Sequence, residues 1–273
     1  MRAVADAFLS RLGRIGVFLW SGWAGLAGFA LIAALWQAGH ERYGDFILPA
    51  PLATLGAMAD LLREPATWEM AAATAARALQ GFVIGGLVGA GAGLIAGYSF
   101  SAMRIARPIL TVMLGVPPIA WIVLAMIWFG STDGTVVVTV VIAIFPLVFV
   151  GAAEGVMTRD KKLDEMARAF GASAHERLTT LALRQMSAHL FPALGLALGT
   201  AFKVAVMAEL LANIDGVGGA LATARANLDI AEALAWVMIA VAALIAAEYG
   251  LVHPVRSEFE RWRDAERPWG VKR

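Results

Sequence analysis

Residues 135–153 read TVVVTVVIAIFPLVFVGAA, nineteen positions without a charged side chain. As an α-helix with a rise of ~1.5 Å per residue, a run of this length crosses about 30 Å, the thickness of the hydrocarbon core of a bilayer. Runs of similar length recur in this chain of 273 residues, of which 60% are hydrophobic and 16% are charged. Soluble domains are closer to half apolar and a quarter charged. The sequence therefore predicts an integral membrane protein.

Six apolar runs predict an all-α polytopic fold with six transmembrane helices. Backbone groups in lipid must bond within their own segment, and a barrel would show alternating segments of ~10 residues instead. The first run follows an arginine-containing start, as in a signal peptide, but it is too long for one, which favours a retained anchor. The six expected spans are residues 15–36, 72–97, 108–129, 135–153, 189–212 and 231–252.

The distribution of lysine and arginine predicts the orientation of these spans. With the N-terminus inside, segments 1–14, 98–107, 154–188 and 253–273 carry 3, 2, 6 and 6 basic residues, which makes 17 of the 22, whereas the outer segments carry 3. Cytoplasmic loops of membrane proteins are enriched in positive charge. We therefore expect a cytoplasmic N-terminal segment (1–14), a membrane domain (15–252) and a cytoplasmic C-terminal tail (253–273).

Two further patterns concern packing. After Pro49 and Pro51, four apolar residues recur at helical spacing, which predicts a short helix that either lies on the outer membrane surface or acts as a packed connector; they are Leu52, Leu55, Ala59 and Leu62. The second span has a glycine at every fourth position, and small residues at this spacing let another helix approach closely. The partner helix is in the same chain or in a second copy. These helix-packing glycines are Gly81, Gly85, Gly89, Gly93 and Gly97.

Motifs for catalysis and metal binding do not occur in this sequence. None of the four lysines precedes a Ser or Thr as a P-loop requires, and neither HExxH nor GxSxG is present. The four histidines are scattered and the chain has no cysteine, so no metal site is expected. The net charge of +1 gives no basic surface for nucleic acid. The chain is therefore not expected to be an enzyme.

A few unusual residues within the spans are candidates for a translocation path. Lys203 lies in the fifth span, where a charge is costly unless it is paired or wetted, so it has a structural or gating role or lines a solute path. Glu209 is six residues further on and does not share its helix face. Pro117 and Pro118 interrupt the third span, where we expect the helix to bend or open.

The segment 159–177, RDKKLDEMARAFGASAHER, has nine charged residues among nineteen. Its apolar residues lie at i, i+3, i+4 and i+7 and form one face of a short helix. Gly171 is placed to end that helix, and Ser173 with Glu176 forms a capping box for a second one. The residues alone allow either a surface that docks on another protein or a hairpin packed on its own domain. The apolar residues are Leu163, Met166, Ala167 and Phe170.

This segment resembles the EAA loop of permease subunits of bacterial ABC importers, which has Glu-Ala-Ala, a glycine a few residues later and a following helix. Here the motif runs from Glu165 through Gly171 to Ser173. Other motifs resemble the subfamily that imports nitrate, sulfonates, taurine and related solutes, and the resemblance covers roughly residues 45–260. These motifs are Ile47-Leu48-Pro49-Ala50-Pro51, Val116-Pro117-Pro118-Ile119-Ala120-Trp121, Trp128-Phe129-Gly130 and Ala208-Glu209.

Two positions depart from the family pattern. Met166 stands in the middle of Glu-Ala-Ala, and Leu183-Arg184 replaces the usual Leu-Pro, with a proline only at Pro192. Because proline bends a helix, its absence is expected to leave the start of the fifth span straighter. The departures concern the coupling geometry rather than the family.

The resemblance implies a type I ABC importer permease fold in the bacterial inner membrane. Two permease subunits, here two copies of this chain, would form the pathway for a small, anionic solute. A cytoplasmic ATPase dimer would bind ATP and Mg, and a periplasmic binding protein would deliver the solute. The loop 154–188 would hold the helix that couples the permease to the ATPase. The coupling residues implied are Leu163, Asp164, Glu165, Met166, Ala167, Arg168, Phe170, Gly171 and Ser173.

Two other classes remain as alternatives at this point. A secondary transporter driven by an ion gradient would bind its coupling ion with midplane carboxylates or unwound segments, usually on repeated halves. The sequence has no internal repeat and few such carboxylates. A membrane scaffold without a pathway would be supported mainly by the glycine-rich second span.

Overall fold

A computed structural model describes residues 27–252, and every regular element in that range is helical. The expected terminal segments 1–14 and 253–273 lie outside the described residues, as does the part of the first expected span before residue 27. A helix over 27–43 continues that span. The elements that follow are α2 (Pro51–Leu61), α3 (Pro65–Tyr98), α4 (Phe100–Gly115), α5 (Pro118–Phe129), α6 (Asp133–Met157), α7 (Lys161–Ala169), α8 (Ala174–Glu176), a π-helix (Arg177–Ala182), α9 (Leu183–Ala212), α10 (Val217–Ala226), α11 (Ile230–Ala247) and a second π-helix (Glu248–Val252).

Four of the described helices are long and apolar enough to cross a membrane, and they correspond to the second, fourth, fifth and sixth expected spans. Helix α3 begins at Pro65, earlier than expected, because proline at the first helical position costs no hydrogen bond. The four helices are Pro65–Tyr98, Asp133–Met157, Gln185–Ala212 and Ile230–Gly250.

The third expected span, 108–129, is not one helix. Residues in that region form α4 and α5, whose axes meet at 94°. Val116 and Pro117 are both extended, because each precedes a proline, and Pro118 begins α5 as a residue without a backbone donor. The expected bend at the two prolines is therefore confirmed, whereas the expected start of the helix at residue 108 is wrong, since α4 begins at Phe100.

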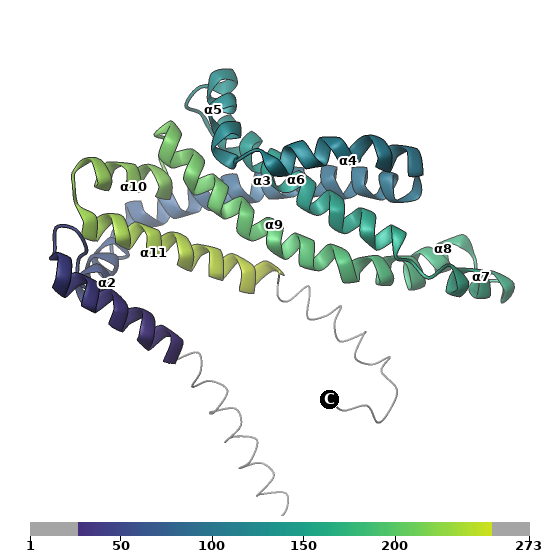
Figure 1. The fold of residues 1–273 in the computed structure, drawn as a ribbon, viewed down its shortest axis with the longest axis horizontal. Helices are drawn as coiled ribbons and strands as arrows, with labels where there is room; N and C mark the ends of the chain where they lie inside the picture. The colour runs from purple at the N-terminus through teal and green to yellow at the C-terminus, as the bar shows by residue number, and fades with distance from the viewer. Residues whose placement is uncertain (1–26, 253–273) are drawn as a thin grey trace, which may run out of the picture.

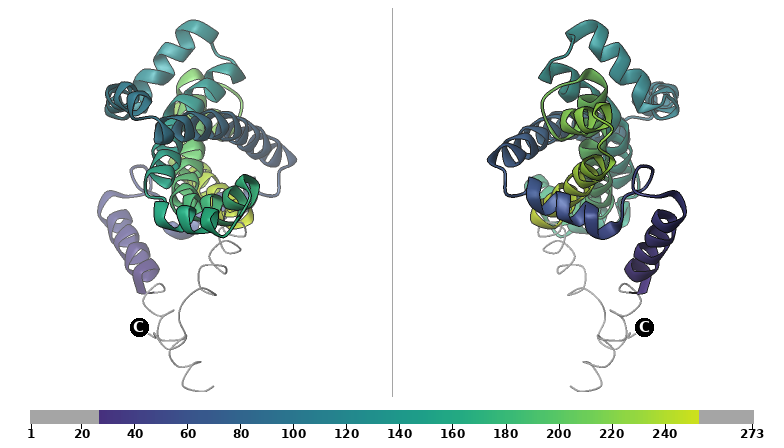
Figure 2. Two further views of the ribbon diagram at one scale, coloured as in Figure 1. Left: turned by 90° about the vertical axis from the view of Figure 1, so that its right-hand side faces the viewer. Right: turned by 90° about the vertical axis from the view of Figure 1, so that its left-hand side faces the viewer.

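Helices α3, α6 and α9 run side by side and form the centre of the molecule (Figure 1). The buried core between them is made of Val, Ile, Leu and Ala side chains, including Val140, Ile144 and Leu198. Helices α4 and α5 lie along one side, while α11 and α2 lie along the other (Figures 1 and 2). The α7 and α8 segment projects from one end of the bundle, at the cytoplasmic ends expected for α6 and α9 (Figure 1).

The glycine stripe of α3 packs on α6 of the same chain, one of the two partners that the sequence left open. A Cβ atom at Gly89 would lie 2.8 Å from the carbonyl oxygen of Phe145, and one at Gly85 would lie 2.8 Å from Ile144. Glycines of α6 in turn allow α9 to pack closely on the other side of α6. A Cβ atom at Gly155 would lie 2.9 Å from the carbonyl oxygen of Met186 in α9. The three helices thus approach to backbone contact.

The predicted short helix before the second span is α2, which begins at Pro51. It packs on α11, and Met58, Leu61 and the following Leu62 belong to a cluster around Trp236 that also contains residues of α10. Leu52 and Leu55 of the expected apolar face are exposed instead. One side of α2 is therefore packed, as expected for a connector. The other side, with the two exposed leucines, is apolar and uncovered in this chain.

Candidate coupling loop and transport groove

Helix α7 has well-defined ends for an element of its length. Asp160 caps its N-terminus, since the Asp160 carboxylate accepts hydrogen bonds from the backbone N–H groups of Lys162 at 2.8 Å and Leu163 at 3.4 Å. Asp164 in the first turn and Arg168 in the last turn suit the helix dipole. The expected helix is therefore present with one further cap, Asp160, that the sequence analysis did not assign.

The helix ends at Gly171 as predicted. Gly171 has a φ of +82°, which favours glycine, and two backbone bonds close the end: Gly171 N–H to Arg168 at 3.0 Å and Ala172 N–H to Ala167 at 3.0 Å. The two bonds form a Schellman motif. The chain therefore reverses within a few residues, and α7 stands as a separate short helix.

The predicted capping box is also present. The backbone N–H of Ser173 donates to the Glu176 carboxylate at 2.8 Å, and the Glu176 N–H donates to the Ser173 hydroxyl at 3.2 Å. The backbone bond and the second bond from the Ser173 hydroxyl hold the pKa of Glu176 below its ordinary value. The following helical segment continues from α8 through the π-helix into α9 without a break.

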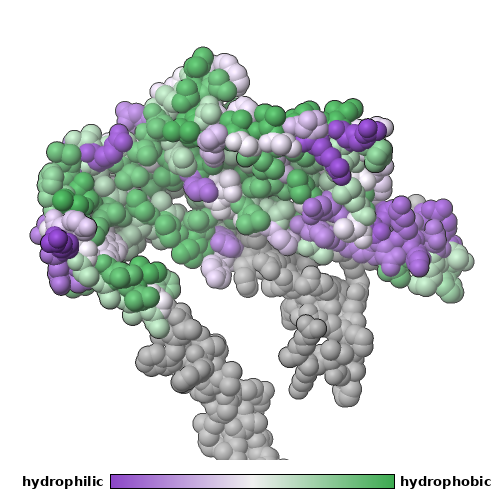
Figure 3. Space-filling view, in the orientation of Figure 1, coloured by the Kyte–Doolittle hydropathy of each residue, from purple (hydrophilic) through white to green (hydrophobic). Residues whose placement is uncertain are grey.

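The apolar face of α7 is uncovered in this chain. Phe170 is 84% exposed, Met166 53% and Leu163 37%. Figure 3 shows hydrophilic residues gathered over this end of the molecule, with an apolar patch at the tip of the segment. The predicted amphipathic helix therefore presents its apolar side to the surroundings of the chain rather than to its own domain.

Two side-chain contacts join the segment 159–177 to the bundle and one joins its two helical parts, and none of the three was predicted from the sequence. Asp164 pairs with Arg177 at 3.2 Å, with both side chains mostly buried. The Asp160 N–H donates to the Gln185 side-chain oxygen at 2.9 Å, and Arg159 donates to the Tyr98 hydroxyl at 2.9 Å while lying over its ring. The segment is thus connected to α3 and to the start of α9.

Glu209 is at the centre of a polar cluster, named here the Glu209 cluster (Thr74, Arg77, Asp133, Glu209 and Gly218). The Glu209 side chain is fully buried and accepts hydrogen bonds from Thr74 at 2.8 Å, Arg77 at 2.7 Å and the Gly218 N–H at 3.0 Å. Arg77 also pairs with Asp133 at 2.8 Å. The cluster joins α3, α6, α9 and α10 at the end of the bundle opposite to α7.

Glycines after α9 make room for this carboxylate. A Cβ atom at Gly216 would lie 2.6 Å from the Glu209 carboxylate, and one at Gly218 would lie 2.6 Å from its Cβ. Gly216 also has a φ of +155°. The sequence signals for the cluster were an arginine and a glutamate within two different spans and the glycines of Gly216-Val217-Gly218-Gly219, but nothing in their spacing paired them.

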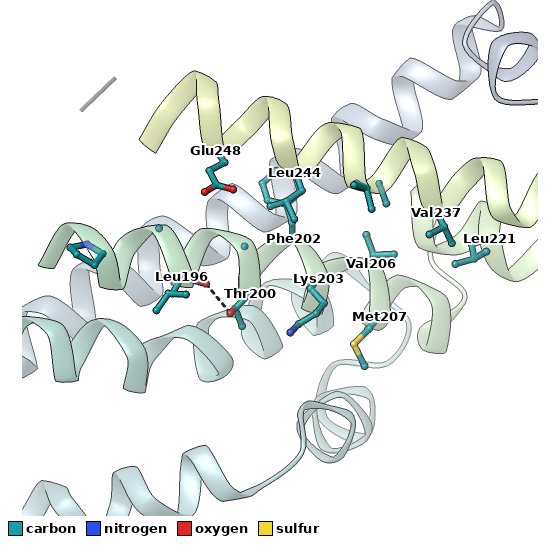
Figure 4. A pocket seen from close by; sticks show the side chains of 15 residues that line it. Leu196, Thr200, Phe202, Lys203, Val206, Met207, Leu221, Val237, Leu244 and Glu248 are labelled. Carbon is teal, nitrogen blue, oxygen red and sulfur yellow. Dashed lines mark hydrogen bonds between the residues drawn. The ribbon is translucent and has the colours of Figure 1, made fainter. Parts of the chain in front are cut away.

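Lys203 lines a cavity of about 880 Å³ between α9, α10 and α11. The wall is mostly apolar, and Glu248 is the other ionisable residue on it. Figure 4 shows Thr200, Lys203 and Met207 extending from one side of α9. Neither Glu209 nor the Pro117–Pro118 bend lines this cavity, so the structure separates the four candidate pathway residues into three places.

Comparison with known proteins then decides the family. Residues 70–249 match the family described as the inner membrane component of binding-protein-dependent transport systems. The chain belongs to this permease family. The permease is accordingly a multi-pass inner membrane protein and not itself an enzyme, and in ABC transporters of this kind a partner ATPase handles ATP.

Individual relatives are similar to this permease over most of its length. The permease is 28% identical to a putative aliphatic sulfonates transport permease of Bacillus subtilis over 75% of each chain. It is 30% identical to the taurine transport permease of Escherichia coli over 66% of this chain and 64% of that one. It is 25% identical to the bicarbonate transport permease of Synechococcus elongatus over 71% and 73%. The matched family region contains α7, the Glu209 cluster and the Lys203 cavity.

Proposed function

We propose that the permease forms the membrane pathway of an ATP-driven importer and that α7 is the element that docks on the separate ATPase. The observation that carries this proposal is the exposed apolar face of Leu163, Met166 and Phe170 on a helix capped at both ends. An amphipathic helix of this kind binds by laying its apolar face into a groove on another protein. The exposed side chains of Glu165 and Arg168 on α7 would pair with charged side chains at the rim of that groove.

The proposed solute is a small anion. The names of the three relatives refer to aliphatic sulfonates, taurine and bicarbonate, which have an anionic group in common. Lys203 provides a positive charge on a cavity within a candidate membrane span. Glu209 already accepts bonds on both of its oxygens, so we assign it to holding the outer helix ends together and keep Lys203 as the pathway residue.

We propose further that two copies of the permease form the pathway. The cavity wall includes the exposed residues Leu196 of α9 and Val237 and Val241 of α11, so α9 and α11 share an apolar outer surface. A second copy placed against this surface would close the open side of the cavity. The Pro117–Pro118 bend turns α5 across the bundle, where Ile122 is buried in the core, and leaves Ile127 and Trp128 of α5 exposed as a further apolar surface for a partner.

The docking role is tested by replacing Phe170 with alanine and measuring binding of the cognate ATPase to the purified permease. Loss of a buried aromatic anchor costs about 2–4 kcal/mol at an interface, so we expect affinity to fall at least ~30-fold. Phe46→Ala is the matched control, because Phe46 is similarly exposed (71%) but precedes α2. Unchanged ATPase binding by the Phe170 variant would contradict the proposal.

The transport role is tested with proteoliposomes that contain the permease, its ATPase and its binding protein. With the ATPase facing the vesicle lumen, uptake of solute should require ATP in the lumen. Uptake should persist when an ionophore removes ion gradients. Uptake that continues without ATP and stops with the ionophore would instead indicate a secondary transporter. No flux under either condition would indicate a scaffold.

A further inference from the structure

Lys203 is an unusual residue for its position. It lies about 14 Å along α9 from the helix end at Ala212, at ~1.5 Å per residue, inside the candidate span Gln185–Ala212. Its side chain is exposed and, among the described residues, makes no hydrogen bond or ion pair. A charge at this depth is costly unless water or an opposite charge reaches it. The cavity on which it lies is therefore expected to admit water or an anion.

Lys203 is the main group on the cavity wall that could bind an anion. Thr200, one turn away, donates its hydroxyl to the Leu196 carbonyl at 2.8 Å, so it has no hydrogen left to offer. Glu248 is the other ionisable residue on the wall, and Figure 4 shows Lys203 pointing away from it. The remaining wall is apolar, including Val206 and Leu244.

We infer that this cavity is a transient binding site for the imported solute, in which Lys203 holds the anionic group and the apolar wall accommodates a short alkyl chain. This inference rests on the import function proposed above and specifies the solute class as a small organic monoanion such as an alkanesulfonate. The cavity volume is within the range of small-molecule sites, ~300–1,000 Å³. A single cation without supporting donors binds weakly, as a pathway requires, because the solute must leave again.

The absence of cysteine from the chain allows a direct test of charge selection in the cavity. Thr200→Cys introduces one thiol on the wall, and the probes are methanethiosulfonate reagents that carry either a sulfonate or a trimethylammonium group. The full-length permease with its ATPase is placed in phosphatidylcholine nanodiscs. We expect the sulfonate reagent to react faster than the cationic one, and pentanesulfonate to slow that reaction.

The role of Lys203 follows from a second substitution in the same background. Lys203→Met should lower the ratio of the two rates about tenfold, which corresponds to ~1.4 kcal/mol, whereas Lys203→Arg should preserve it. An unchanged ratio in the Met variant, or no reaction with either reagent, would overturn the inference. Nanodiscs with anionic phosphatidylglycerol distinguish a lipid: if that lipid slows modification and pentanesulfonate does not, the site holds a lipid headgroup and the inference is wrong.

Uptake by the same variants separates this inference from the proposed function. In proteoliposomes, Lys203→Met should lose most ATP-dependent uptake, while Thr111→Val, which removes a hydroxyl bonded to its own helix α4 away from the cavity, should retain it. If the unmodified permease shows no ATP-dependent uptake, the proposed function fails whatever the thiol rates show. If the unmodified permease transports and Lys203→Met transports equally, only the Lys203 site fails.

Discussion

Glu209 shows how one buried residue can determine the arrangement of several helices. Its carboxylate receives hydrogen bonds from α3 and from the start of α10, and Arg77 extends the contact to Asp133 of α6. Burying charged groups is costly, so each must keep its partners. The Glu209 cluster therefore makes the helix ends that lie opposite to α7 dependent on one another.

The first prediction concerns this carboxylate. Glu209→Gln should lower the free energy of unfolding by about 3 kcal/mol, because Arg77 loses its buried counter-charge. Asp133, which is exposed, would remain as the other carboxylate paired with Arg77. The thermal midpoint of the purified permease should fall by about 6–12 °C. Glu248→Gln is the control, since Glu248 is exposed. Equal midpoints for the two variants would show that the cluster contributes no stability.

At the scale of elements, the contact between α3 and α6 depends on the glycines that face α6. The second prediction uses two glycines of the same helix. Gly89→Ala should destabilise by about 1–3 kcal/mol, because its Cβ meets the Phe145 carbonyl at 2.8 Å. Gly91→Ala should stabilise by about 0.5–1 kcal/mol, because nothing lies within 4 Å and alanine favours a helix. Thermal unfolding measures both, and changes of the same sign would contradict the prediction.

The third prediction concerns the link between α7 and the helix that leads into the membrane. Asp164 pairs with Arg177, so Asp164→Arg or Arg177→Asp should let α7 dock but fail to transmit its movement. We expect solute uptake per ATP hydrolysed to fall about tenfold, which corresponds to ~1.4 kcal/mol. The exchange of both charges should restore most of it. Full coupling in the single variants, or no recovery in the double variant, would exclude this role for the pair.

For the whole molecule, the fourth prediction concerns orientation in the membrane. The turn before α2 and the α7 segment lie at opposite ends of the molecule (Figure 1), and the lysine and arginine bias predicts that α7 is cytoplasmic. In this cysteine-free chain, Phe46→Cys in spheroplasts should react with an impermeant maleimide, whereas Phe170→Cys should react only in inside-out vesicles. Labelling of both from the same side would contradict the predicted topology.

Local chemistry explains what the sequence could predict. Gly171, the Ser173–Glu176 capping box and the break at Pro117–Pro118 depend on residues a few positions apart, and the structure confirms each one. The long apolar helices follow from hydropathy alone.

Contacts between distant residues could not be predicted in the same way. Arg77 and Glu209 are 132 positions apart, and Asp164 reaches Arg177 only after the chain reverses at Gly171. The sequence showed that Lys203 and Glu209 are unusual in a membrane span. It could not show that Glu209 pairs with Arg77 while Lys203 lies on a cavity, because that depends on how α3, α9 and α11 are packed.

The uninterrupted helical path from Ala174 through the π-helix to Ala212 has a consequence for the timing of transport. This path is about 58 Å long at ~1.5 Å per residue and connects the proposed docking end with Lys203 and Glu209. It contains no loop that could relax separately. Under the proposed function, nucleotide-driven movement of α7 and the change in solute access at Lys203 belong to one kinetic step, so reporters placed at the two ends should change with the same rate constant.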